Sequence, residues 1–98
     1  MSSPVVLRPE ASQDAETTRD YYELQLSGLG QAFLGQLNDV LQRITDTPQI
    51  YAPVWNDVRA ARLRRFTYVV YYRIRKDRIE VLAVVHGSRD TTAWKSRV

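Results

Sequence analysis

Residues 68–85 read YVVYYRIRKDRIEVLAVV and form the clearest β-sheet pattern in the chain. The first part of this segment is rich in aromatic and β-branched side chains, which suit a pleated surface. The polar triplet Lys76-Asp77-Arg78 interrupts the pattern and predicts a hairpin turn. The unbroken apolar run from Val81 onward predicts a second strand, buried on both faces near the centre of a sheet.

The beginning of the chain predicts a short strand followed by a helix. Residues 5–7 are apolar and form the strand, which Pro9 ends. Ser12 is expected to cap a helix that runs from Gln13 to about Leu26. Residues spaced three or four apart define its apolar face: Ala15, Thr18, Tyr22 and Leu26.

A second helix is predicted after the glycine-containing turn at residues 27–30. It ends near Thr47, because Pro48 disfavours helical geometry in the residue before it. Its stripe is longer and more apolar, and consists of Leu29, Phe33, Leu37, Val40, Leu41 and Ile44. Two helices joined by so short a turn are expected to form an antiparallel hairpin.

The order of these elements predicts an α+β fold in a single domain that spans residues 1–98. An N-terminal strand and the helix hairpin precede an antiparallel meander of about three strands, with residues 49–57 irregular. Strands and helices that are segregated in this way place the hairpin on one face of a single sheet. Six residues are expected to fill the core between helices and sheet: Phe33, Leu37, Leu41, Phe66, Val81 and Ala83.

The composition excludes several classes of protein. The chain has no Cys and one His, which argues against disulfides, a thiolate metal site and a zinc centre, and no cofactor is expected. It has no apolar run of the roughly 20 residues that a membrane-spanning helix needs. The N-terminus lacks the pattern of a signal peptide. These features predict a soluble, cytoplasmic protein without a membrane partner.

The charges are distributed unevenly along the chain. Residues 1–57 contain three Arg and eight acidic residues, a net charge of −5. Residues 58–98 contain nine Arg, two Lys and three acidic residues, a net charge of +8. Such a segment projects a positive field, and the preference for Arg over Lys favours a surface that binds carboxylates or phosphates. The alternative is that these residues are the solvated faces of strands.

Three motifs resemble the RelE/ParE family of type II toxin–antitoxin systems. Residues 64–73, RRFTYVVYYR, resemble the family's central RRFPYxVxYR strands, with Thr67 where proline is common. Residues 84–90, VVHGSRD, resemble the end of its last strand, and Trp94 with Arg97 resembles the tail that follows. Residues 7–11, which lead into a helix, fit the same pattern, so the resemblance spans nearly the whole chain. It is greatest to the ParE branch.

The resemblance implies a compact toxin that inhibits growth and is held inactive by an antitoxin, whose C-terminal segment wraps around it. ParE-type members poison DNA gyrase and have a role in plasmid stabilisation, whereas RelE-type members cut mRNA on the ribosome. Because one fold serves both mechanisms, the fold alone does not identify the target. We expect a ParE-like gyrase inhibitor. The alternative is a RelE-like, ribosome-dependent endoribonuclease, and only in that case is the protein an enzyme. A third interpretation, outside the family, is an inert nucleic-acid-binding module that contacts phosphates through the arginines of its strands.

The nuclease alternative would need a general base, a general acid and a cation that stabilises the charged phosphorane. The candidates for this site are His86, Arg65, Arg73 and Arg89. Strand alternation predicts that His86 lies on the same face as Val84 and Leu82. A structural role for His86, hydrogen-bonded at the sheet edge, is the competing interpretation.

Two binding surfaces are also predicted. Tyr71 is expected to share a face with Arg73 and Arg75, while Tyr72 points inward with Val70 and Ile74. The residues expected to bind the target are Arg65, Tyr71, Arg73, Arg89, Trp94 and Arg97. The antitoxin is expected to bind the helix hairpin through Tyr22, Leu26, Phe33 and Leu37, and to pair with a free sheet edge in a toxin–antitoxin hetero-oligomer.

Overall fold

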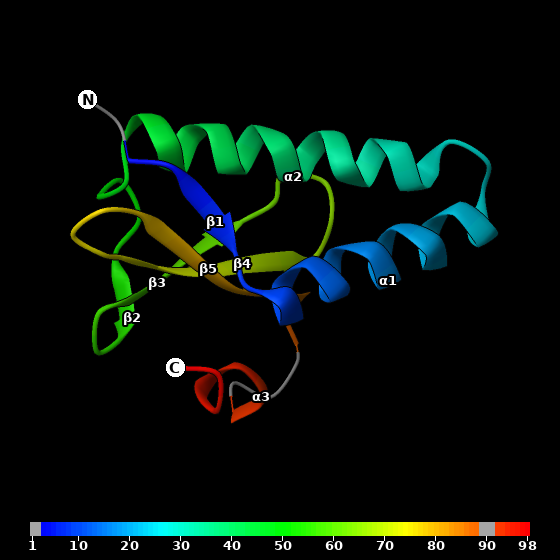
Figure 1. Cartoon of the computed structure of the whole chain (residues 1–98). Coiled ribbons are helices and arrows are strands. Elements are labelled where there is room, and N and C mark those ends of the chain that lie inside the picture. The colour runs from blue at the N-terminus through cyan, green and yellow to red at the C-terminus, as the bar shows by residue number, and fades with distance from the viewer. Residues whose placement is uncertain (1–2, 89–91) are drawn as a thin grey trace.

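A computed structural model describes residues 3–88 and 92–98 of the chain. Within these residues, strands and helices follow one another along the chain as shown in Figure 1. The elements are β1 (Val5–Leu7), α1 (Pro9–Gln25), α2 (Leu29–Asp46), β2 (Pro53–Trp55), β3 (Val58–Arg62), β4 (Tyr68–Ile74), β5 (Ile79–His86) and α3 (Thr92–Lys95). The predicted α+β order of a strand, two helices and a meander is therefore confirmed.

The strands form one sheet in the order β1-β5-β4-β3-β2. The meander β3–β4–β5 is antiparallel, as expected, but β1 pairs with β5 in parallel, so the sheet as a whole is mixed. Strand β5 lies between β1 and β4, which explains its continuous apolar sequence. The expectation that residues 49–57 are irregular was wrong for β2, which pairs with β3 at the sheet edge.

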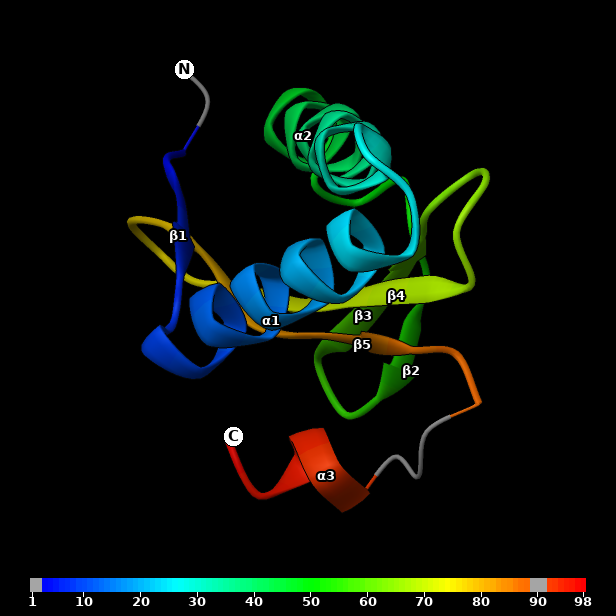
Figure 2. The same ribbon diagram turned by 90° about the vertical axis from the view of Figure 1, so that its right-hand side faces the viewer.

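Helices α1 and α2 cover one face of the sheet, and α3 lies against the other face (Figures 1 and 2). The helix-side core contains Phe33, Leu37, Val40, Ile44, Val70, Tyr72, Ile79, Val81 and Val84 among its buried residues. The α3-side core contains Val58, Val69, Tyr71, Leu82, Ala83, Val85 and Trp94.

Three of the six core predictions hold as made, namely Phe33, Leu37 and Val81. Leu41 and Phe66 pack against the helix-side core but are only partly buried. Ala83 is buried on the opposite face, beneath α3.

Tyr72 points toward the helices together with Val70, as its alternation predicted. Its hydroxyl donates a hydrogen bond to the Pro48 carbonyl at 2.6 Å. Burial raises the pKa of Tyr72, so the phenol stays protonated and remains a donor.

Helix α1 begins earlier than the sequence pattern suggested. The expected cap at Ser12 was wrong, because Pro9 is the first helical residue and Arg8 occupies the N-cap position. The ring of Pro9 fixes φ near the helical value, and the position it occupies needs no backbone N–H. The Ser12 N–H instead closes the first turn on the Arg8 carbonyl at 3.0 Å.

The connection between α1 and α2 depends on Gly28, which has a φ of 89°. Only glycine adopts such a backbone readily. The Glu23 carboxylate accepts hydrogen bonds from the backbone N–H groups of Gly28 and Gly30 and so closes the turn. Leu26 lies just past α1 and is 64% exposed, so its expected place on the buried face was wrong.

A β-bulge in β5 changes which side chains share a face. Tyr71 lies opposite Ala83, whereas Tyr72 lies opposite Val81, so Leu82 is the additional residue. Leu82 and Ala83 consequently both belong to the α3-side core. The expectation that His86 shares a face with Leu82 was wrong for this reason, because strict alternation does not pass through a bulge.

Candidate functional site

Trp94 is the anchor that holds α3 against the sheet. Its ring is 1% exposed and stacks on Tyr71, with centroids 4.4 Å apart and an interplanar angle of 19°. Trp55 meets the same ring edge-on at 5.7 Å. The Trp94 Nε1–H has no acceptor within residues 3–88 and 92–98, so ring packing holds the side chain. Tyr71 and Trp94 are therefore buried, contrary to the expectation that they contact a target.

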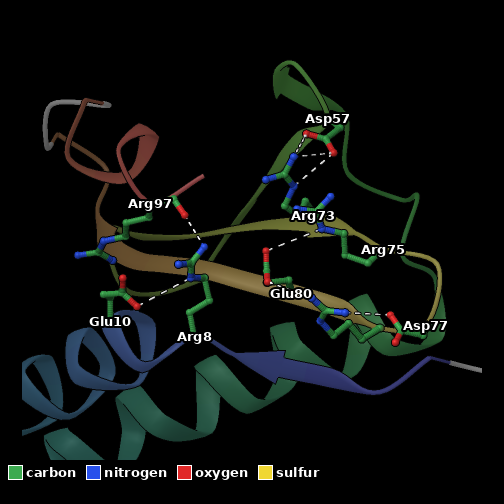
Figure 3. A network of polar contacts seen from close by, with 9 residues as sticks. Arg8, Glu10, Asp57, Arg73, Arg75, Asp77, Glu80 and Arg97 are labelled. Atoms are coloured by element: carbon green, nitrogen blue, oxygen red, sulfur yellow. Dashed lines mark hydrogen bonds and ion pairs between the residues drawn. The ribbon is translucent and has the colours of Figure 1, made fainter.

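Arg97 is held by contacts within the chain. Its Nη1 lies 2.6 Å from Asp14 Oδ2 and donates to the Leu82 carbonyl at 3.2 Å. The same Asp14 oxygen accepts the backbone N–H of Val84 at 3.1 Å. Arg8 donates to the Arg97 carbonyl, as Figure 3 shows. Asp14, which belongs to none of the sequence motifs, thus joins α1, β5 and the C-terminal segment.

Arg73 is also engaged in an ion pair. Its guanidinium binds Asp57 with Nη2 3.0 and 3.1 Å from the two carboxylate oxygens and Nε 3.3 Å from one of them (Figure 3). The Arg73 side chain is only 12% exposed. This is the bidentate geometry that Arg favours with carboxylates, and it leaves little of the guanidinium for a target.

His86 lies at the exposed end of β5 and uses both ring nitrogens. Nδ1 accepts the backbone N–H of Ser88 at 3.1 Å, and Nε2 lies 2.8 Å from Thr67 Oγ1. Because Nδ1 must accept, the neutral ring carries its proton at Nε2 and donates it to Thr67. The ring also meets Tyr68 edge-on at 5.4 Å. This geometry corresponds to the structural alternative, a hydrogen-bonded histidine at the sheet edge.

Of the residues of the nuclease alternative, Arg73 lies far from His86. Tyr68 lies opposite His86, whereas Arg73 lies opposite Glu80, five residues farther along β4. At about 3.3 Å per residue, this places Arg73 roughly 16 Å away along the strand. Arg65 is exposed in the β3–β4 loop at the His86 end, and Arg89 falls outside the described residues.

A crevice of about 310 Å³ separates α1 from the outer edge of β5. It is lined by Asp14, Thr17, Thr18, Tyr21, Tyr68, Val84, Val85 and His86. Strand β1 pairs with β5 as far as Val81, and no strand of the described residues covers the β5 edge beyond it. The predicted free sheet edge is therefore found beside α1.

The four residues predicted to bind the antitoxin separate into two groups. Phe33 and Leu37 are fully buried core residues, so they offer no surface to a partner. Tyr22 is half-buried against Phe33 and Phe66, and this burial raises its pKa, with Tyr68 and Tyr21 adding to the effect. Leu26 is exposed.

One exposed apolar surface lies at the C-terminal end of α1. Leu24 is 88% exposed there, and Tyr21 and Leu26 are also largely accessible. We refer to Tyr21, Leu24 and Leu26 as the α1 apolar patch. The sequence pattern predicted Leu26 on the apolar face of the helix, but this residue is exposed. The pattern did not include Leu24, because Leu24 does not follow the three- or four-residue spacing of that face.

Three arginines stand apart from the ion pairs described above. Arg62, Arg64 and Arg65 are exposed and make no hydrogen bond or ion pair within the described part of the chain, whereas every other arginine there has such a contact. Of these three arginines, only Arg65 was predicted to bind the target. The RLRR spacing of residues 62–65 was the signal that could have identified the group.

No helix in residues 3–88 or 92–98 is both long enough and apolar enough to cross a membrane. The same residues contain no group of three or more His, Cys, Asp or Glu side chains placed to hold a metal ion.

Comparisons with known proteins agree on one family. The family described as "ParE toxin of type II toxin-antitoxin system, parDE" matches residues 5–91. Two curated relatives are each named Toxin ParE2, from the CDC 1551 / Oshkosh and H37Rv strains of Mycobacterium tuberculosis. Each is 36% identical over 59 residues, which cover 60% of this chain and 56% of the relative. The match therefore spans a little over half the length of these relatives.

A solved structure has a similar fold. It is described as the "Chromosomal ParDE TA system from P. aeruginosa" and aligns with a TM-score of 0.66 at 15% identity. The alignment covers 87% of this chain and 96% of that chain. At this identity the likeness shows the fold alone.

Proposed function

The chain belongs to the ParE toxin family of type II toxin–antitoxin systems, and from this premise we propose that it inhibits DNA gyrase and is neutralised by a cognate antitoxin. In this proposal the toxin acts in the cytoplasm, where gyrase works on DNA. It needs no proton transfer of its own, because it blocks another enzyme.

The observation that carries this proposal is the separation of Arg73 from His86. Strand register places Arg73 at the far end of β4 from His86, and Arg73 is bound to Asp57. Ribonucleolytic cleavage requires an acid, a base and a cation within reach of one phosphate. His86 and Arg73 cannot serve one phosphate in this arrangement, which favours the gyrase inhibitor over the RelE-like endoribonuclease.

Two features support an antitoxin partner. The α1 apolar patch offers exposed hydrophobic surface for an amphipathic segment. Beyond Val81, the β5 edge beside α1 is not paired with β1, so an extended segment can add to it once it replaces the Asp14 contact to the Val84 N–H. Both features lie along α1, so one antitoxin chain can contact them together in a toxin–antitoxin hetero-oligomer.

The proposal is tested by supercoiling of relaxed plasmid DNA with purified gyrase. We expect the parent protein to inhibit supercoiling and the His86→Gln variant to inhibit it to a similar extent. Glutamine retains a polar group for Thr67 and Ser88, so the variant is expected to fold. For a nuclease, the same substitution would slow cleavage by about 10²–10⁴-fold. Unimpaired supercoiling, combined with mRNA cleavage that His86→Gln abolishes, would establish the nuclease instead.

A further inference from the structure

The β3–β4 hairpin presents its free arginines from a firmly anchored loop. Leu63 is buried, and its N–H bonds to the Tyr68 carbonyl at 3.0 Å. Phe66 packs edge-on against Tyr22 and Phe33, with centroids 4.9 and 5.5 Å away. Arg64 and Arg65 lie between these two anchors and are exposed. The backbone that carries them is therefore fixed by packing, although their guanidinium groups have no partner in the described chain.

Arg62 connects this hairpin to a groove on the α3 side of the sheet. The groove has a volume of about 300 Å³ and is lined by Val54, Trp55, Ala60, Arg62, Val69, Tyr71, Trp94 and Lys95. Among the described residues of this lining, two are cations and none is acidic. Lys95 Nζ lies 5.2 Å from the centre of the Trp55 ring. The groove therefore combines positive charge with aromatic walls.

Within residues 3–88 and 92–98, no acidic side chain pairs with the arginines of the hairpin. Arg73, Arg75, Arg78 and Arg97 all lie in the basic half of the chain, and each has an acidic partner. Such pairs explain why these arginines are present. The same explanation does not apply to Arg62, Arg64 and Arg65, and Arg62 shares the groove with a further cation, Lys95.

A ligand that matches this surface carries several anionic groups and a flat ring. The planar guanidinium fork binds phosphate oxygens in a bidentate manner, and closely spaced arginines suit successive phosphates. Aromatic side chains beside a cationic groove are typical of proteins that bind single strands, because each base offers a face for stacking. An acidic peptide would satisfy the cations but would make no use of the Trp55 wall.

We propose that the β3–β4 hairpin and the adjoining groove bind single-stranded nucleic acid, with Arg62, Arg64 and Arg65 on successive phosphates and a base against Trp55. Lys95 leaves the Trp55 ring face and pairs with a phosphate when the base enters. The binding belongs to the toxin chain itself and does not depend on gyrase inhibition, so each proposal can fail without the other.

The test is fluorescence anisotropy of labelled oligothymidine and oligouridine, each of about 16 nucleotides. For the parent protein, the logarithm of the association constant is expected to fall linearly with the logarithm of the salt concentration between about 50 and 200 mM. The variant Arg62→Gln/Arg64→Gln/Arg65→Gln removes three phosphate contacts. Each phosphate contact on a single strand adds about 0.7 to the magnitude of this slope, so the triple variant is expected to reduce the magnitude by about 2. Comparing the two oligomers distinguishes a DNA ligand from an RNA ligand.

The matched control is Arg75→Gln/Lys76→Gln/Arg78→Gln in the β4–β5 turn. It removes the same number of positive charges at the opposite end of β4, where Arg75 and Arg78 are already paired with acidic residues. We expect its salt slope to stay close to that of the parent. An equal loss in both variants would overturn the proposal, because it would mean that net charge alone drives binding. Single Arg64→Gln and Arg65→Gln variants, each expected to lower the slope by about 0.7, provide the same test if the triple variant does not fold.

Tryptophan fluorescence tests the role of the groove. Both tryptophans of the chain line it, so a base that stacks there is expected to quench the fluorescence. Three results would overturn the proposal. The first is failure of the protein to bind the oligonucleotides, and the second is binding without a change in tryptophan fluorescence while inorganic polyphosphate displaces them at equal phosphate concentration. The third result is displacement of the oligonucleotides by polyglutamate as effectively as by unlabelled oligonucleotide. The last result would identify the surface as a site for acidic protein segments.

Discussion

At the scale of single residues, Asp14 shows how one carboxylate can organise three elements. It lies on α1, accepts the Val84 N–H of β5, and pairs with Arg97 after α3. The Val84 N–H lies just beyond the part of β5 that β1 covers, so the carboxylate replaces a missing strand partner. A backbone donor in a half-buried position would otherwise be left without a partner, at a cost of about 1–3 kcal/mol.

We predict that Asp14→Asn lowers the free energy of unfolding by about 3 kcal/mol. The side chains of Asp14 and Arg97 are 15% and 19% exposed, and loss of one partner from a buried pair leaves an uncompensated charge. Denaturant unfolding of Asp14→Asn, Arg97→Gln and the double variant should give a coupling energy of about 0.5–3 kcal/mol.

Asp77→Asn serves as the control, because Asp77 forms an exposed ion pair with Arg78. Its cost is expected to be below about 1 kcal/mol. Equal effects of Asp14→Asn and Asp77→Asn would show that the Asp14 contacts add no stability beyond that of a surface ion pair.

At the scale of the elements, local sequence patterns identified the helices and the central hairpin because these depend on short-range periodicity. The period of α2 predicted the buried Phe33 and Leu37, and the polar triplet 76–78 predicted the β4–β5 turn. The start of α1 was missed because Pro9 can end a strand or begin a helix. The bulge at Leu82 was missed because it depends on how β5 pairs with β4. The sequence of β5 alone does not indicate this pairing.

The candidate site was less predictable than the fold for the same reason. Arg73 and Arg97 were chosen as target contacts because they are basic and lie in family-like motifs. Their partners Asp57 and Asp14 are distant in sequence and meet them only after folding. The burial of Trp94 likewise depends on where α3 docks. Arg65 is exposed, because it lies in a loop between the apolar residues Leu63 and Phe66. This feature is visible in the local sequence.

The α1–α2 turn gives a prediction for two glycines of the same helix. A Cβ on Gly30 would lie 2.6 Å from the Arg19 carbonyl oxygen, whereas a Cβ on Gly35 would have no atom within 4 Å. Gly30→Ala is therefore expected to lower the free energy of unfolding by about 1–3 kcal/mol, because the backbone of α1 must move. Gly35→Ala should raise it by about 0.5–1 kcal/mol through helix propensity alone.

Thermal or denaturant unfolding of the two glycine variants gives the comparison directly, since both carry the same change in the same helix. A stabilised Gly30→Ala protein would show that α1 and α2 do not approach each other as closely as the structure indicates.

At the scale of the whole molecule, the uneven charge of the two halves is partly resolved within the fold. Asp14 and Asp57 of the acidic half neutralise Arg97 and Arg73 of the basic half. Among the described arginines, those of the β3–β4 hairpin, Arg62, Arg64 and Arg65, make no hydrogen bond or ion pair, and Lys95 lies at the groove that adjoins them. The α1 apolar patch is built from a different part of the chain, so separate surfaces are available for an antitoxin and for an anionic ligand.

This separation predicts variants that escape the antitoxin but remain toxic. Leu24→Glu/Leu26→Glu places two charges on the α1 apolar patch, where both side chains are already exposed, so the fold should tolerate the change. If the antitoxin packs an apolar helix face on this patch, burial of unpaired carboxylates should weaken its binding by at least about 10-fold. Ile50→Glu is the control, because Ile50 is comparably exposed but lies in the α2–β2 connection. Calorimetric titration with the antitoxin and growth under co-expression should both separate the two variants. An antitoxin that neutralises Leu24→Glu/Leu26→Glu as well as it neutralises Ile50→Glu would exclude the patch as its binding surface and leave the β5 edge as the remaining candidate.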